Sequence, residues 1–143
     1  MKPYSFFTYL LAHLKTVQMS GAVIFGNNVF LVPTFPTQQM PSMISPTCLV
    51  MDNGASPYSS HSDLVEQSFT VGFWLSKVDR YGEAGVLKFL EIEEALYADL
   101  RDLKTLNSEK VNILENSKKA FQVTSNNYPL MSRYWSFSVI LTI

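Results

Sequence analysis

The chain has only two histidines, the commonest acid–base catalysts, and they lie far apart in the sequence. His61 lies in a serine-rich stretch that ends in Asp63, so residues 59–63 hold the residue types of a serine hydrolase. A Ser-His-Asp triad needs a rigid scaffold that brings its three side chains together, and neighbouring residues of one loop rarely meet that geometry. His13 falls beside an apolar helical stripe, where a packed or half-exposed ring is expected. We therefore expect no hydrolytic site.

Metal and cofactor sites are equally unsupported. Cys48 is the only cysteine, and one cysteine with two distant histidines does not match a zinc-site spacing. The glutamates of residues 91–94 have no histidine three positions on, as a di-iron helix would. No glycine-rich phosphate motif is present. Cys48 lies in an apolar run, so inert burial is expected. We expect no enzyme activity, no cofactor and no metal.

The most informative feature is where charge is missing. Residues 16–51 contain no Asp, Glu, Lys or Arg, and only Lys2, Lys15 and Asp52 are charged in the first 62 residues. Charged residues make up 16 % of the chain, against about a quarter in an ordinary soluble domain. Half of the chain thus lacks the residues that normally face water. Burial against other protein is favoured, with a well-buried monomer as the alternative.

The bulk charge and hydropathy exclude two further classes. The formal net charge is −1, without the basic face that nucleic-acid binding normally requires. No apolar run reaches the roughly 20 residues of a membrane helix, and the N-terminal apolar stretch lacks a clean signal-peptide pattern. We expect neither specific nucleic-acid binding nor membrane association.

The first half is expected to alternate short elements with irregular chain. Apolar spacing predicts a helix over residues 3–18, and residues 22–32 are expected to form a β-hairpin around Gly26. Four prolines in residues 33–46 exclude a helix or a central strand and indicate an extended, uncharged arm. A short strand is expected over residues 47–51. Residues 53–63, rich in Ser, Asn, Gly and Pro, are expected to form an exposed polar loop.

The second half has clearer periodicity. Strict alternation predicts strands over residues 64–78 and 134–143, and a helix is expected over residues 83–103. The helix's apolar stripe includes Val86 and is widened by Leu90. A further strand is expected over residues 120–125. Because few strands are joined by helix-length crossovers, we expect one α+β domain over residues 1–143. Its mostly antiparallel sheet of about five strands carries the N-terminal helix and the long helix.

This order of elements resembles the bacteriophage tail terminator and neck family. The resemblance covers nearly the full length, and an N-terminal helix leads into a hairpin in both. It rests on a proline-marked strand, a second strand, a helix over residues 83–103 and an aromatic-rich last strand. The three strand motifs are Ser45-Pro46-Thr47-Cys48-Leu49-Val50-Met51, Gln67-Ser68-Phe69-Thr70-Val71-Gly72-Phe73-Trp74 and Arg133-Tyr134-Trp135-Ser136-Phe137-Ser138-Val139-Ile140-Leu141.

The resemblance implies a structural virion protein at the tail–neck junction, assembled in the host cytoplasm. It implies a homo-oligomeric ring, a hexamer in this family, that caps the tail tube, ends its growth and joins it to the head connector. The implied partners are further copies, the tail tube protein and connector or neck proteins, and DNA can pass through the ring. The alternatives are another neck or tail-completion protein of similar fold, a small-molecule-binding α+β domain with a Phe- and Met-lined pocket, and a host regulatory module.

A ring requires a contact between two different patches, one on each neighbouring copy. The uncharged arm is one candidate patch, and the sheet edge and the loop at residues 53–63 are candidates for contact with the tube. Trp74 alternates onto the outer face of its strand. The subunit or tube contacts are therefore expected at Phe30, Phe35, Met40, Met43, Ile44, Tyr58, His61 and Trp74.

Overall fold

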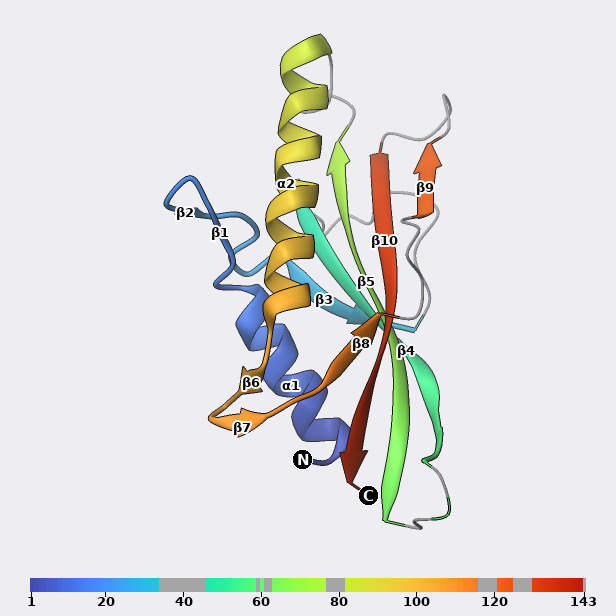
Figure 1. Cartoon of the computed structure of the whole chain (residues 1–143). Coiled ribbons are helices and arrows are strands. Elements are labelled where there is room, and N and C mark those ends of the chain that lie inside the picture. Colours follow the sequence, from blue (N-terminus) through green and yellow to red (C-terminus); the bar gives the residue numbers. More distant parts are fainter. Residues whose placement is uncertain are drawn as a thin grey trace.

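A computed structural model describes residues 1–33, 46–58, 60, 63–76, 82–115, 121–124 and 130–142. Two helices, α1 (Pro3–Leu14) and α2 (Gly82–Asp102), lie on one side of a twisted sheet (Figure 1). The strands of that sheet are β3 (Val29–Val32), β4 (Thr47–Pro57), β5 (Leu64–Ser76), β8 (Ile113–Glu115), β9 (Phe121–Thr124) and β10 (Leu130–Thr142). Two small hairpins pair β1 (Gln18–Met19) with β2 (Ala22–Val23) and β6 (Thr105–Leu106) with β7 (Glu109–Lys110).

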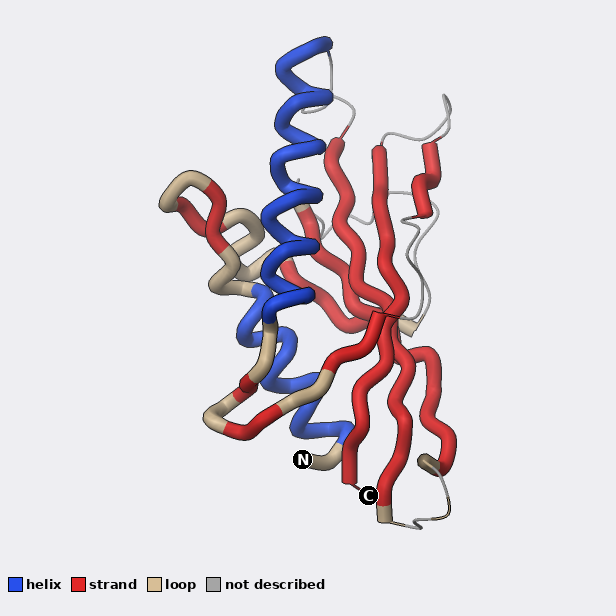
Figure 2. Tube along the Cα trace, in the orientation of Figure 1, coloured by secondary structure: helices blue, strands red, loops and turns tan. Residues whose placement is uncertain are grey.

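The sheet has the order β3-β4-β5-β10, and both β8 and β9 pair with the far side of β10 (Figure 2). It is therefore five strands wide. Every pair is antiparallel except β3 with β4. The expected α+β fold, with a mostly antiparallel sheet, an N-terminal helix and one long helix, is confirmed.

The core lies between the helices and the sheet. In β5 and β10, alternate residues turn toward the helices, as their period-two patterns require. Phe69 stacks on Phe137 with ring centroids 5.5 Å apart, and Phe6 of α1 meets Phe69 edge-to-face at 5.2 Å. Phe89 of α2 lies 4.8 Å from the ring of Phe73. These rings join both helices to the two central strands.

The N-terminal helix begins as expected and ends earlier than expected. Pro3 occupies its first turn, where the missing N–H costs nothing. The helix ends at Leu14 rather than near residue 18, because Gln18–Met19 pair with Ala22–Val23 instead. Ser20 and Gly21 between them have positive φ angles of 54° and 81°, the conformation of a tight hairpin turn.

The hairpin predicted over residues 22–32 is wrong. The turn itself exists, since the N–H of Asn28 bonds to the carbonyl of Phe25 at 3.0 Å. The following strand, β3, however runs parallel to β4 rather than back along residues 22–25. A parallel pair needs a connection of a dozen or more residues, and residues 33–46 supply it.

Strand β4 is longer than expected and reaches into the predicted loop. Residues 53–57 belong to β4, and only their exposure matches the prediction. A register shift between Asp52 and Gly54 makes a bulge, and the buried amide of Gln67 stabilises it. Its nitrogen Nε2 donates to Oδ1 of Asp52 at 2.6 Å and to the carbonyl of Gly54 at 3.0 Å. Pairing with β5 has thus made a strand of residues 53–57, although their own composition has a low strand propensity.

The long helix matches its predicted bounds but not all of its predicted buried face. Its core positions are Phe89, Ile92, Leu96 and Leu100. Val86 and Leu90, which we expected in the buried stripe, are 47 % and 42 % exposed. Each helical residue advances by about 100°, so Leu90 points well away from its buried neighbour Phe89. The first turns of α2 also extend past the ends of β5 and β10 (Figure 1).

Candidate functional site

Trp74 and Phe30 lie on the face of the sheet opposite the helices. Trp74 packs with Leu49 and Tyr134 in a second, smaller apolar cluster, and Phe30 and Val32 pack partly against it. The alternation of β5 thus places Trp74 correctly on the outer face. Only 3 % of Trp74 is exposed, so its ring is covered within its own chain. Phe30 is half-buried at the sheet edge. Their predicted role in subunit contacts stays a prediction.

Tyr134 shapes this outer cluster by covering a glycine. Gly72 lies opposite Tyr134 in the β5–β10 register, and a Cβ there would collide with the Tyr134 ring. It would also lie 2.7 Å from the backbone oxygen of Arg133. Burial raises the pKa of Tyr134, and interactions with Ser132 and Trp74 partly offset that rise. The glycine in the strand is therefore a packing requirement.

Tyr58 lies just after β4, where the polypeptide turns toward β5. Its side chain is 42 % exposed, and its N–H bonds to the carbonyl of Leu64 at 3.0 Å. Its predicted role in subunit or tube contacts stays a prediction. The other predicted contact residues lie outside the described part of the chain. They are Phe35, Met40, Met43, Ile44 and His61.

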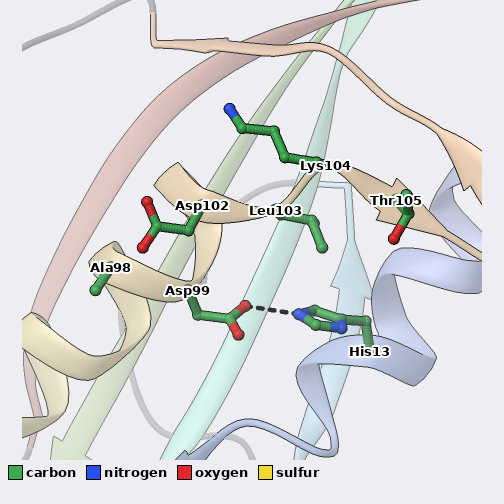
Figure 3. A pocket seen from close by; sticks show the side chains of 7 residues that line it. All are labelled: His13, Ala98, Asp99, Asp102, Leu103, Lys104 and Thr105. Atoms are coloured by element: carbon green, nitrogen blue, oxygen red, sulfur yellow. Dashed lines mark hydrogen bonds and ion pairs between the residues drawn. The ribbon is translucent and has the colours of Figure 1, made fainter.

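The fold brings a histidine and a carboxylate together between the two helices. His13 of α1 and Asp99 of α2 line a groove of about 560 Å³, together with Ala98, Asp102, Leu103, Lys104 and Thr105. Figure 3 shows the imidazole directed at the carboxylate, with Nε2 and Oδ2 2.6 Å apart. Sequence reasoning placed His13 beside the helix stripe but gave no sign of its partner, because 86 residues separate the two.

This pair does not resemble an assembled catalytic site. Thr105 is the one residue with a hydroxyl among those that line the groove. The interaction marked in Figure 3 is the one between His13 and Asp99. A triad would need the hydroxyl on the second ring nitrogen. In the described part of the chain, no three His, Cys, Asp or Glu residues come together as metal ligands. The arrangement joins two helices.

The buried thiol and the ion pair beneath α2 also have structural roles. Cys48 is fully buried, and burial raises the pKa of its thiol far above the ordinary value, so the thiolate is strongly disfavoured. Arg133 of β10 forms an ion pair with Glu93 of α2. The Arg133 guanidinium also lies 5.2 Å from the centre of the Phe89 ring. The side chains of Arg133 and Glu93 are both largely buried, so their ion pair fixes α2 against the sheet.

Exposed apolar side chains form the surface feature that sequence reasoning missed. On α2, Val86, Leu87 and Leu90 are 47 %, 56 % and 42 % exposed. On α1, Tyr4 is 84 % exposed. Beside α2, a crevice of about 220 Å³ opens next to the β1–β2 hairpin. It is lined by Met19, Ala22, Val23, Ile24, Pro46, Lys88 and Ile92. Leu87 could have indicated this surface from the sequence, because it is an apolar residue that lies outside the buried stripe of its helix.

No protein-family model matches this chain, and a search of curated proteins finds no match either. None of the helices in the described residues is both long enough and apolar enough to cross a membrane.

Proposed function

We propose that this chain is a structural subunit of a phage tail terminator or neck ring, which caps the tail tube and joins it to the head connector. Further copies of the chain, the tube protein and connector proteins are its partners in this proposal. It acts by binding, without turnover and without a cofactor.

The observation that carries the proposal is the combination of an uncharged first half with apolar side chains left exposed on both helices. Residues 16–51 carry no charge, and Tyr4, Leu87 and Leu90 project from the helical layer. Exposed apolar side chains that gather at one place, as Val86, Leu87 and Leu90 do on α2, are typical of protein contacts. The α+β order of helix, strands, helix and last strand agrees with what the resemblance implies.

The pocket-binding alternative finds less support in the described residues. A ligand site would be a concave, mainly apolar pocket with a few convergent polar groups. The groove at His13 is instead bordered by Asp99, Asp102 and Lys104, and its histidine is already paired with a carboxylate. The crevice at Met19 is apolar, but at about 220 Å³ it is smaller than a typical ligand pocket.

The test is electron microscopy of the purified protein, alone and mixed with tubes assembled from the tail tube protein of the same genome. Light scattering supplies the mass in parallel. We expect rings of several 16.2-kDa copies, or caps on one end of the tubes. A monomer that neither forms rings nor binds tube ends would overturn it.

A further inference from the structure

The outer side of α1 presents an uncharged stripe that ends in Lys15 and is preceded by a second lysine, Lys2. Tyr4, Thr8, Ala12 and Lys15 recur at helical spacing, and all four are exposed. Lys2 lies just before the helix and is exposed as well. Residues 1–16 contain no acidic residue. We refer to Tyr4, Thr8, Ala12 and Lys15 as the α1 stripe.

The outer side of α2 presents the opposite charge. Glu83, Leu87, Leu90 and Glu94 lie at positions i, i+4, i+7 and i+11, and all four are exposed. We refer to them as the α2 stripe. Residues 83–94 contain four glutamates and one lysine, and one of these glutamates, Glu93, is paired with Arg133. The stripe therefore has two leucines in its centre and an exposed glutamate at each end.

The two stripes match in length and in charge. Each runs over twelve residues, so its first and last residues are eleven helical steps, or about 17 Å, apart. If one stripe is laid on the other, the leucines meet the uncharged middle of α1. Lys2, just before the α1 stripe, and Lys15, at its other end, then lie near the two glutamates. Complementary charges at the ends of an apolar contact fix its register more than they add affinity.

The stripes are separate surfaces of one copy. The C-terminal half of α2 lies against α1 through His13 and Asp99, and the N-terminal half of α2 runs away from α1 (Figure 1). The α2 stripe lies on this N-terminal half, while Tyr4 is near the opposite end of the helical layer. Two different complementary patches on one molecule make a head-to-tail contact, which builds rings when the rotation closes.

We propose that the α1 stripe of one copy docks on the α2 stripe of the next copy, and that this helix-to-helix contact links neighbouring subunits. The inference rests on the proposed ring function and names the surface that forms it. We take the molecule that binds the α2 stripe to be a second copy of this chain. The α1 stripe has the matching length, and lysines lie at or next to its two ends.

Charge exchange tests the contact. Lys2→Glu with Lys15→Glu places acid against acid, and Glu83→Lys with Glu94→Lys places base against base. We expect each pair to weaken self-association at least tenfold by sedimentation or light scattering, and all four changes in one chain to restore it. Lys110→Glu is the matched control, since Lys110 is exposed on β7 outside both stripes, and it should leave association unchanged.

Cross-linking tests the same contact where free self-association is weak. Thr8→Cys and Leu87→Cys chains are mixed, with and without tail tubes, and treated with a short bifunctional maleimide. Because Cys48 is fully buried, the background reaction should be low. We expect cross-linked dimers from the mixture and far fewer from either chain alone. Lys110→Cys mixed with either chain is the control.

These results separate the inference from the proposed function. Rings or tube caps that persist in both charge-reversed variants, with no cross-link above the control, would overturn the contact and leave the ring function standing. A specific cross-link and charge rescue without rings or caps would support the contact and count against the ring function. Variants that lose association and are not restored by the four combined changes would also count against the contact.

Discussion

The Nε2 atom of His13 lies 2.6 Å from the Oδ2 atom of Asp99, and this contact joins the last turn of α1 to α2. Each side chain is less than a third exposed, at 28 % and 26 %. The two residues come from opposite halves of the sequence, so the contact forms only when the helical layer is complete. It fixes the relative position of the two helices whose outer stripes we propose as the subunit contact.

Asp99→Asn should lower the free energy of unfolding by about 1 kcal/mol, because a hydrogen bond to a charged group is replaced by a neutral one. His13→Ala should cost about the same, and the double variant should cost less than the sum. Urea unfolding followed by circular dichroism measures all three. Arg101→Ala is the control, because its pair with Asp102 is exposed and should contribute nothing measurable. Strictly additive losses would contradict a direct interaction.

Glu93→Gln should be the most destabilising of the polar changes. It leaves the Arg133 guanidinium largely buried between β10 and α2 without its carboxylate partner. Breaking such a pair from one side costs roughly 3 kcal/mol. Replacing both residues, with Glu93→Leu and Arg133→Met, removes both charges and should recover most of that loss. A Glu93→Gln protein as stable as the parent would show that Arg133 is held by other contacts alone.

The sequence predicted most of the fold because most of its pattern is local. Alternation in β5 and β10 and the 3.6-residue period of α2 follow from neighbouring residues, and their positions agree with the structure to within a few residues. Alternation also placed Trp74 on the outer face. The parallel pairing of β3 with β4 was missed because a turn at Gly26 predicts a local hairpin, and only the whole sheet decides which strand β3 meets.

The contacts that hold the surface features in place were not predictable in the same way. His13 and Asp99 are 86 residues apart, and Glu93 and Arg133 are 40 apart, so no local spacing connects them. Residues 53–57 have the composition of a loop, yet pairing with β5 makes them a strand. Leu90 fits the helical period of α2 loosely, and only the position of the sheet decides that it stays exposed.

Gly72→Ala should destabilise the protein by about 1–3 kcal/mol, the cost of overpacking a close contact. The new Cβ would meet the Tyr134 ring and lie 2.7 Å from the backbone oxygen of Arg133, so both strands must shift. Thermal unfolding of Gly72→Ala and of Gly72→Ala with Tyr134→Ala measures the effect. The second variant should recover only part of the loss, since the backbone contact remains. Ser68→Ala, on the same face of β5, is the control and should change little.

Stability should fall at alkaline pH partly because of Tyr134. Burial raises the pKa of this phenol above its value in the unfolded chain, which is about 10. The folded state therefore holds the proton more tightly, and this contribution is fully present below pH 10. It is lost as the pH rises through the raised pKa, because the unfolded chain ionises first. We expect the urea midpoint of the parent protein to fall above about pH 10 more steeply than that of Tyr134→Phe. Parallel curves for the two proteins would show that Tyr134 ionises equally easily in both states, and that the outer cluster of β4, β5 and β10 is open to water.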